Sequence, residues 1–176
     1  MQQVIVQKFG GTSVGSGERI AAVAEIIKNE AEMNTVVVVV SAMAGETDRL
    51  IELSKLFGDN PNKREFDALI STGEKVSASL LAMALNSLGL KAKSYSAAQV
   101  SLKTTSNFSK AKILDIDKAK MEEILADGSI PIITGFQGIT ETGEVTTLGR
   151  GGSDTTAVAI AVSYTHLTLP TKSRVG

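Results

Sequence analysis

Three loops rich in small or polar residues follow short apolar runs, and they carry the side chains best suited to chemistry. They are residues 8–17, 41–47 and 149–154. In an open α/β sheet, ligands bind beyond the carboxyl ends of the strands, where such loops meet helix N-termini. Glycine lets backbone N–H groups approach an anion, and Lys8 and Arg150 add a cation to two of these loops. The loops therefore predict a site for an anionic ligand such as a polyphosphate.

Two common phosphate-binding loops do not fit this sequence. No Gly-Lys-Ser/Thr follows four residues after a glycine, as a Walker A loop requires. Gly15 and Gly17 begin a dinucleotide fingerprint, but Ile20 stands where its third glycine belongs. The absence of cysteine excludes thiol catalysis, thiolate metal sites and disulfides. The bland alternative is that each loop is only a tight connection between elements.

Strands and helices alternate along the chain and must position these loops. Hydrophobic periodicity predicts a strand that begins at 4–6 and ends in the segment 8–17, strands at 36–40, 91–97 and 130–134, a hairpin within 101–117, and helices at 20–31, 50–56, 62–88 with a break near 71–74, 117–126 and 155–161. Five consecutive valines, 36–40, have no polar alternation and indicate a strand buried on both faces. Five apolar residues are expected in the core: Leu80, Leu81, Met83, Leu85 and Leu88. The alternation predicts an α/β fold with a mainly parallel sheet between helical layers.

Composition narrows the function classes. The 176 residues are 43% apolar and 21% charged, which is typical of one globular domain or a large piece of one. A net charge of −1 argues against a nucleic-acid partner. The longest apolar run, 36–40, is far short of the ~20 residues that span a membrane, so no membrane partner is expected. The start of the chain has no basic and apolar leader, and we expect a cytoplasmic protein.

Four segments resemble the signature segments of the aspartokinases, within the amino acid kinase family. They are KFGGTS at 8–13, VVVSAM at 38–43, STGE at 71–74 and GRGGSD at 149–154, in the family's order and spacing within residues 2–161. The resemblance implies a three-layer α/β/α sandwich of the amino acid kinase (carbamate kinase-like) fold, truncated. It also implies transfer of the ATP γ-phosphoryl group to the side-chain carboxylate of L-aspartate, giving 4-phospho-L-aspartate, the first step towards lysine, threonine and methionine.

The resemblance further implies a role for particular residues. As catalytic residues it implies Lys8, which binds the transferring phosphoryl group, and Asp154, which orients Lys8. The nucleotide would contact Lys8, Gly10, Gly11, Thr12 and Ser13. The substrate would contact Ser41, Thr47, Glu74, Arg150 and Ser153, with Glu74 receiving its ammonium group and Arg150 its carboxylate. Mg²⁺ is implied because phosphates need a metal to neutralise their charge.

Five of these residues also have an ordinary structural interpretation. Asp154 can be a favourable charge at a helix start, Ser41 and Thr47 can be helix caps, and Lys8 and Glu74 can be solvated charges. The proposed reaction itself needs no general base, because a carboxylate with a pKa near 4 is already ionised at neutral pH. That agrees with a sequence whose one histidine, His166, lies outside the four segments.

Residues 162–176 depart from the family pattern. Residues 162–171 break the helical pattern of 155–161 and resemble the translation of a sequencing adaptor, so we expect a non-native tail in which His166 has no function. Residues 1–161 are then the N-terminal part of the catalytic domain, and the full-length parent is expected to form a homo-oligomer or hetero-oligomer. Two alternatives stay open: a non-catalytic ligand-binding or assembly fragment, and a related kinase acting on glutamate or acetylglutamate.

Overall fold

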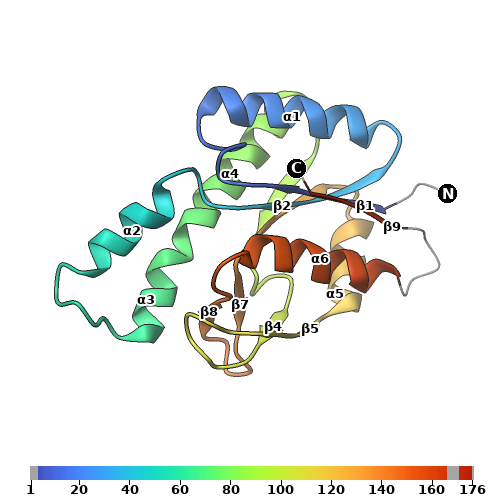
Figure 1. The fold of residues 1–176 in the computed structure, drawn as a ribbon. Coiled ribbons are helices and arrows are strands. Elements are labelled where there is room, and N and C mark those ends of the chain that lie inside the picture. Colours follow the sequence, from blue (N-terminus) through green and yellow to red (C-terminus); the bar gives the residue numbers. More distant parts are fainter. Residues whose placement is uncertain (1–3, 166–170, 176) are drawn as a thin grey trace.

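The computed structural model describes residues 4–165 and 171–175, which form a sheet covered on both faces by helices and a smaller second sheet (Figure 1). The helices are α1 (Gly17–Ala31), α2 (Glu46–Ser54), α3 (Lys63–Ile70), α4 (Thr72–Ser87), α5 (Lys118–Ala126) and α6 (Gly152–Thr165). The strands are β1 (Val4–Phe9), β2 (Thr35–Val40), β3 (Ala92–Tyr95), β4 (Leu102–Thr104), β5 (Ile113–Ile116), β6 (Ile130–Thr134), β7 (Gln137–Ile139), β8 (Val145–Thr147) and β9 (Thr171–Val175).

The valine strand β2 lies at the centre of an all-parallel sheet of order β3-β6-β2-β1-β9. Successive side chains of a strand point to opposite faces, so the valines divide between two hydrophobic clusters. Val37 and Val39 pack with residues of α5 and α6, whereas Val36, Val38 and Val40 pack with residues of α1 and α4. The predicted burial of this strand on both faces is confirmed, and so are the three layers.

The second sheet, of order β5-β4-β7-β8, joins two hairpins that lie far apart in the sequence. The hairpin predicted within residues 101–117 is present as the antiparallel pair β4–β5. A turn at residues 141–144 connects the antiparallel pair β7–β8. A parallel bridge between Lys103 and Ile139 unites the two hairpins. That union was not predicted, because no local pattern reports a contact between such distant segments.

The first strand begins at Val4 and ends at Phe9, inside the glycine-rich segment as expected, because Lys8 and Phe9 still pair with β2. Other expectations, for α2 and α4, were wrong. α2 ends at Ser54, before Leu56. On α4, Leu81 and Leu85 are buried as expected, but Leu80 is 38% and Met83 is 64% exposed, since they lie on the side away from the sheet.

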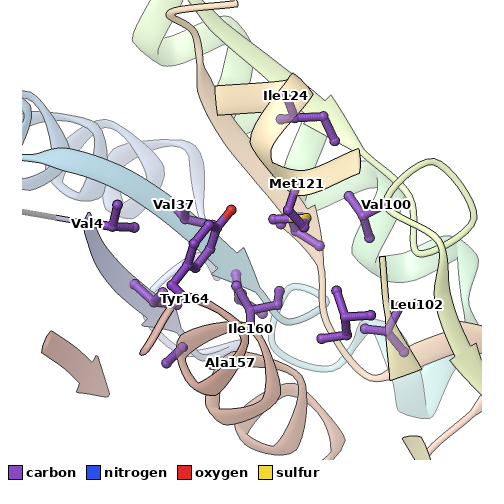
Figure 2. Packing of buried hydrophobic residues seen from close by; sticks show 14 of the residues in the cluster. Val4, Val37, Val100, Leu102, Met121, Ile124, Ala157, Ile160 and Tyr164 are labelled. Carbon is purple, nitrogen blue, oxygen red and sulfur yellow. The ribbon is translucent and has the colours of Figure 1, made fainter. Parts of the chain in front are cut away.

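The end of the chain is more regular than the sequence indicates. α6 begins at Gly152 and continues past residue 161 to Thr165, and β9 pairs in parallel with β1. Tyr164 is 2% exposed and lies beside Val37 and Ile160 in the cluster shown in Figure 2. His166 lies outside the described residues. The non-native origin of residues 162–176 stays a prediction.

One stretch of the described residues, 63–87, is long and apolar enough to cross a membrane by length and composition alone. Half of its apolar 18-residue part is buried, and the stretch comprises α3 and α4, which Ser71 separates. The buried side of α4 packs against α1, β3 and β6, as in the core helix of a globular domain.

Candidate active site

Strand alternation places Lys8 on the face of the sheet that α6 covers. Val4 and Val6 belong to the cluster that includes α6, and Lys8 follows them with the same parity along β1. Asp154 lies in the first turn of α6. Lys8 Nζ is 2.9 Å from Asp154 Oδ1, and the two side chains are 13% and 53% exposed. The alternation of side chains along β1 and the position of the first turn of α6 thus bring together Lys8 and Asp154, which are 146 positions apart in the sequence.

This ion pair lies at a cavity of about 600 Å³ beyond the carboxyl ends of β1 and β2. The three predicted loops contribute to its wall, together with parts of α2, α3 and α4. Eight of the predicted residues line it: Lys8, Gly11, Ser41, Thr47, Glu74, Arg150, Ser153 and Asp154. The structure therefore brings both proposed catalytic residues and every proposed substrate-binding residue to one cavity.

Gly10, Thr12 and Ser13 are not among the residues that line this cavity. The amide of Ser13 donates to the carbonyl of Gly10 at 2.9 Å, which closes a turn within the loop. The carbonyl of Thr12 accepts from the guanidinium of Arg19 at 2.7 Å. Their contact with a nucleotide stays a prediction.

Gly11 holds the first loop against the second. The amide of Ala44 donates to the Gly11 carbonyl at 3.0 Å. A Cβ on Gly11 would lie 2.7 Å from the carbonyl oxygen of Ala42, closer than real Cβ atoms approach. Glycine is therefore required here for the close approach of two backbones.

Glu74 has a buried carboxylate, and one of its two oxygens has no hydrogen-bond partner among the described residues. The residue is 2% exposed, and its Oε1 accepts from the amide of Ala42 at 3.2 Å. Its Oε2 is buried and has no hydrogen-bond partner among the described residues. Burial raises the pKa of Glu74 to about 7. A carboxylate in this state is stabilised by a ligand that brings a cation or a donor to Oε2.

The third loop turns sharply before α6. Gly149 and Gly151 have φ of 80° and 71°, and the exposed Arg150 stands between them. Phe136, which also lines the cavity, has a φ of 70°, an uncommon conformation for a bulky residue. A Cβ on Gly152 would lie 2.8 Å from the Phe136 ring, so the loop packs tightly on this strained residue.

Asp67, Ser109 and Thr147 are at or behind the cavity wall but were not predicted from the sequence. Asp67 is fully buried on α3, and its carboxylate accepts four hydrogen bonds from Ser109 and Thr147, which both line the cavity. The available signal was the spacing of Asp67 and Ile70, which places a carboxylate on the buried face of an amphipathic helix. No comparable signal in the sequence indicates the positive φ of Phe136.

Among the residues that the structure describes, no group of three or more His, Cys, Asp or Glu side chains is placed to hold a metal ion. Asp48 and Asp154 bring single carboxylates to the cavity. Mg²⁺ is usually held by one or two carboxylates together with substrate phosphates and waters, so these residues fit a metal that arrives with a nucleotide.

Comparison with known proteins identifies the family of this chain. Residues 3–165 match the amino acid kinase family. The chain is 54% identical over 161 residues to an aspartokinase of Geobacillus stearothermophilus, a match that covers 91% of this chain and 40% of that protein. It is 53% identical over 161 residues to an aspartate kinase of Pseudomonas putida, covering 91% of this chain and 39% of that protein. The chain thus spans about 40% of the length of these relatives.

Solved structures share the fold. The aspartate kinase from Synechocystis has a TM-score of 0.77 at 48% identity, over 90% of this chain and 26% of that chain. Escherichia coli aspartokinase III in complex with aspartate and ADP has a TM-score of 0.77 at 23% identity, over 98% of this chain and 49% of that chain. With its fold, its cavity and a family match over nearly all described residues, this chain belongs to the amino acid kinase family.

Proposed function

We propose that the protein to which this chain belongs transfers the γ-phosphoryl group of ATP to the side-chain carboxylate of L-aspartate. The observation that carries the proposal is the vacant, buried Oε2 of Glu74, in a cavity that also holds Arg150 and the Lys8–Asp154 pair. The similarity to aspartokinases over 161 residues supports it.

Glu74 and Arg150 offer complementary contacts to an amino acid. The ammonium group would donate to Glu74 Oε2, which gives the buried carboxylate its missing partner. The guanidinium of Arg150 has the planar fork that binds a carboxylate with two parallel hydrogen bonds. The hydroxyls of Ser41, Thr47 and Ser153, in the same wall, provide further donors to the substrate.

The reaction joins one oxygen of the substrate's side-chain carboxylate to the γ-phosphorus and breaks the bond from that phosphorus to the oxygen bridging to the β-phosphate. No proton has to be removed, because the attacking carboxylate is already ionised. The cation of Lys8 would stabilise charge on the transferring group, and Asp154 holds the Lys8 ammonium group in place at 2.9 Å. Mg²⁺ would accompany the phosphates and neutralise part of their charge.

The finer assignments belong to this proposal as well. We place the reaction at the first step of lysine, threonine and methionine biosynthesis, in the cytoplasm, with 4-phospho-L-aspartate as its product. We also propose that the full-length protein is a homo-oligomer or hetero-oligomer and binds neither nucleic acid nor membrane. The net charge of −1 supports the expectation that nucleic acid is not a partner, and the absence of cysteine is compatible with the cytoplasm.

The test is aspartate-dependent release of ADP by residues 1–161 joined to the remaining part of the Geobacillus aspartokinase. Aspartate should be the substrate, with glutamate used poorly and acetylglutamate not at all, because acetylation removes the ammonium group that Glu74 would bind. Equal use of acetylglutamate would contradict the assignment of Glu74. Calorimetry showing that aspartate and ATP-Mg bind, but without turnover, would favour a non-catalytic binding protein.

The variant Arg150→Lys separates the two ligands in the same assay. Lysine keeps the charge but loses the two-pronged geometry, so the KM for aspartate should rise by roughly tenfold, the equivalent of one charged hydrogen bond. The KM for ATP should change much less. A rise confined to the KM for ATP would assign Arg150 to the nucleotide.

A further inference from the structure

We propose that Asp67 is a positioning residue that fixes the Arg150 wall of the cavity relative to Glu74. Asp67 does not line the cavity itself. It acts through Ser109, in the segment between β4 and β5, and through Thr147, the last residue of β8. The inference rests on the proposed function, since it concerns how accurately one amino acid is held between two charged groups.

Each carboxylate oxygen of Asp67 accepts two hydrogen bonds, one from Ser109 and one from Thr147. Its Oδ2 accepts from the amides of Ser109 and Thr147, each at 2.8 Å. Its Oδ1 accepts from the hydroxyls of the same two residues, each at 3.0 Å. The side chain is 0% exposed. A buried carboxylate satisfied by four donors from two separate segments holds those segments in one arrangement, because any shift leaves a buried charge underbonded.

Asp67 joins the parts of the chain that carry the two proposed substrate contacts. Thr147 precedes Arg150 by three residues, and Asp67 lies on α3, which only Ser71 separates from α4 and Glu74. A second tie runs in parallel, because Gln137 Nε2 on β7 donates to the carbonyl of Ser71 at 3.0 Å. The second sheet is therefore fastened twice to the α3–α4 junction, once by a charge and once by an amide.

The chemistry depends on this spacing. An amino acid held at its ammonium and carboxylate ends presents its side chain at a position that both contacts decide together. Displacement of a bound group by about 1 Å can slow a reaction by ~10²-fold. Loosening the Asp67 contacts should therefore weaken aspartate use without altering the groups that touch it.

The test is Asp67→Asn in the joined protein described above. Asparagine has the same shape but only one acceptor oxygen, so it cannot accept from two amides and two hydroxyls. We expect the KM for aspartate to rise on the order of tenfold, with the KM for ATP within about twofold of the unsubstituted value. Asp115→Asn, on an exposed position of β5 outside the cavity, is the matched control and should change neither constant.

A double-mutant cycle tests whether Asp67 acts through its partners. Thr147→Val removes one hydroxyl donor while keeping the shape, and we expect it to raise the KM for aspartate as well. If the two residues form one unit, the double variant Asp67→Asn/Thr147→Val is no worse than Asp67→Asn alone. Full multiplication of the two effects would overturn the inference. Should Asp67→Asn fail to fold, Thr147→Val alone must still show the selective rise.

Two further outcomes are decisive. If Asp67→Asn lowers thermal stability but leaves both KM values unchanged, Asp67 has only a structural role and the inference is wrong. Amide hydrogen exchange supplies a readout that needs no turnover: exchange at Ser109 and Thr147 should speed up in Asp67→Asn, and unchanged exchange would overturn the inference even if the unsubstituted protein phosphorylated no acid. Absence of turnover with faster exchange would refute the proposed function and keep the role of Asp67 in holding the wall.

Discussion

At the scale of single residues, the buried carboxylate of Glu74 lowers the free energy of unfolding of the free protein and provides a binding group for a ligand. Its pKa is raised from 4.5 to about 7, so the folded chain holds a proton that the unfolded chain releases between these values. The free energy of unfolding therefore falls as the pH rises from 4.5 to about 7 and stays low above it, by about 3 kcal/mol from this group. A ligand ammonium group offsets this cost by pairing with the ionised form.

We predict that Glu74→Gln stabilises the free protein at pH 8 and changes its stability little at pH 5. Its urea unfolding, compared with that of the unsubstituted chain at both pH values, measures the difference. We expect the affinity of the unsubstituted protein for aspartate to rise as the pH increases through 7, where Glu74 ionises. The Glu74→Gln variant should bind aspartate more weakly and lack this rise. Glu141→Gln, on an exposed turn, is the control. A pH-independent affinity in the unsubstituted protein would contradict the role of Glu74.

Lys8 is predicted to act mainly on turnover. Its cation would bind charge that grows on the transferring phosphoryl group, so Lys8→Ala should lower kcat by ~10²-fold or more and change the KM for aspartate less. Asp154→Asn should lower kcat by a smaller factor, since Lys8 keeps its charge and loses only the partner at 2.9 Å. Steady-state kinetics of the joined protein give both values. A kcat within a factor of two of the unsubstituted value for Lys8→Ala would refute its catalytic role.

At the scale of elements, α6 serves the site at one end and the core at the other. Its first turn carries Asp154, and its last turn carries Tyr164 in the cluster of Figure 2. The hydroxyl of Tyr164 is buried with no hydrogen-bond partner among the described residues, and burial raises the pKa of the phenol. A phenylalanine would fill the same space without an unsatisfied polar group.

Tyr164→Phe is therefore predicted to raise the free energy of unfolding by about 1 kcal/mol. Urea unfolding of the 176-residue chain measures it, and Tyr95→Phe, on the half-buried β3, is the matched control. A loss of stability on removing the Tyr164 hydroxyl would show that this group is satisfied in solution. The result also bears on residues 162–176, because a core position that prefers a different residue is expected of a tail that did not evolve with this fold.

At the scale of the whole molecule, the chain contains the residues that line the cavity but spans only about 40% of the length of its relatives. β3 and β9 form the edges of the central sheet in the described part. An open strand edge has free N–H and C=O groups that pair readily with other chains. We predict that the isolated 176-residue chain shows no aspartate-dependent ADP release and self-associates, whereas the joined protein is active. Turnover of the isolated chain at a comparable rate would contradict this prediction.

The sequence predicted the features that depend on local pattern. The run of valines at 36–40 specified the central strand, and the glycines at 149–152 specified the turn before α6. The four motif segments contain most of the predicted residues that line the cavity, but they do not contain Ser109, Phe136 or Thr147, which line it as well. The bridge between the two hairpins joins Lys103 to Ile139, 36 positions apart, and the contacts of Asp67 reach residues 42 and 80 positions away, so no local pattern reports them.

The alternation along β1 limits how this protein can vary. Substitutions in β1 exchange one side chain at a time, but insertion or deletion of one residue between Val4 and Lys8 would turn every side chain on one flank of that change to the opposite face. Either the valines would leave their layer or the ammonium group of Lys8 would turn away from Asp154. Natural relatives of this domain should therefore differ in length in their loops and keep the length of this strand constant.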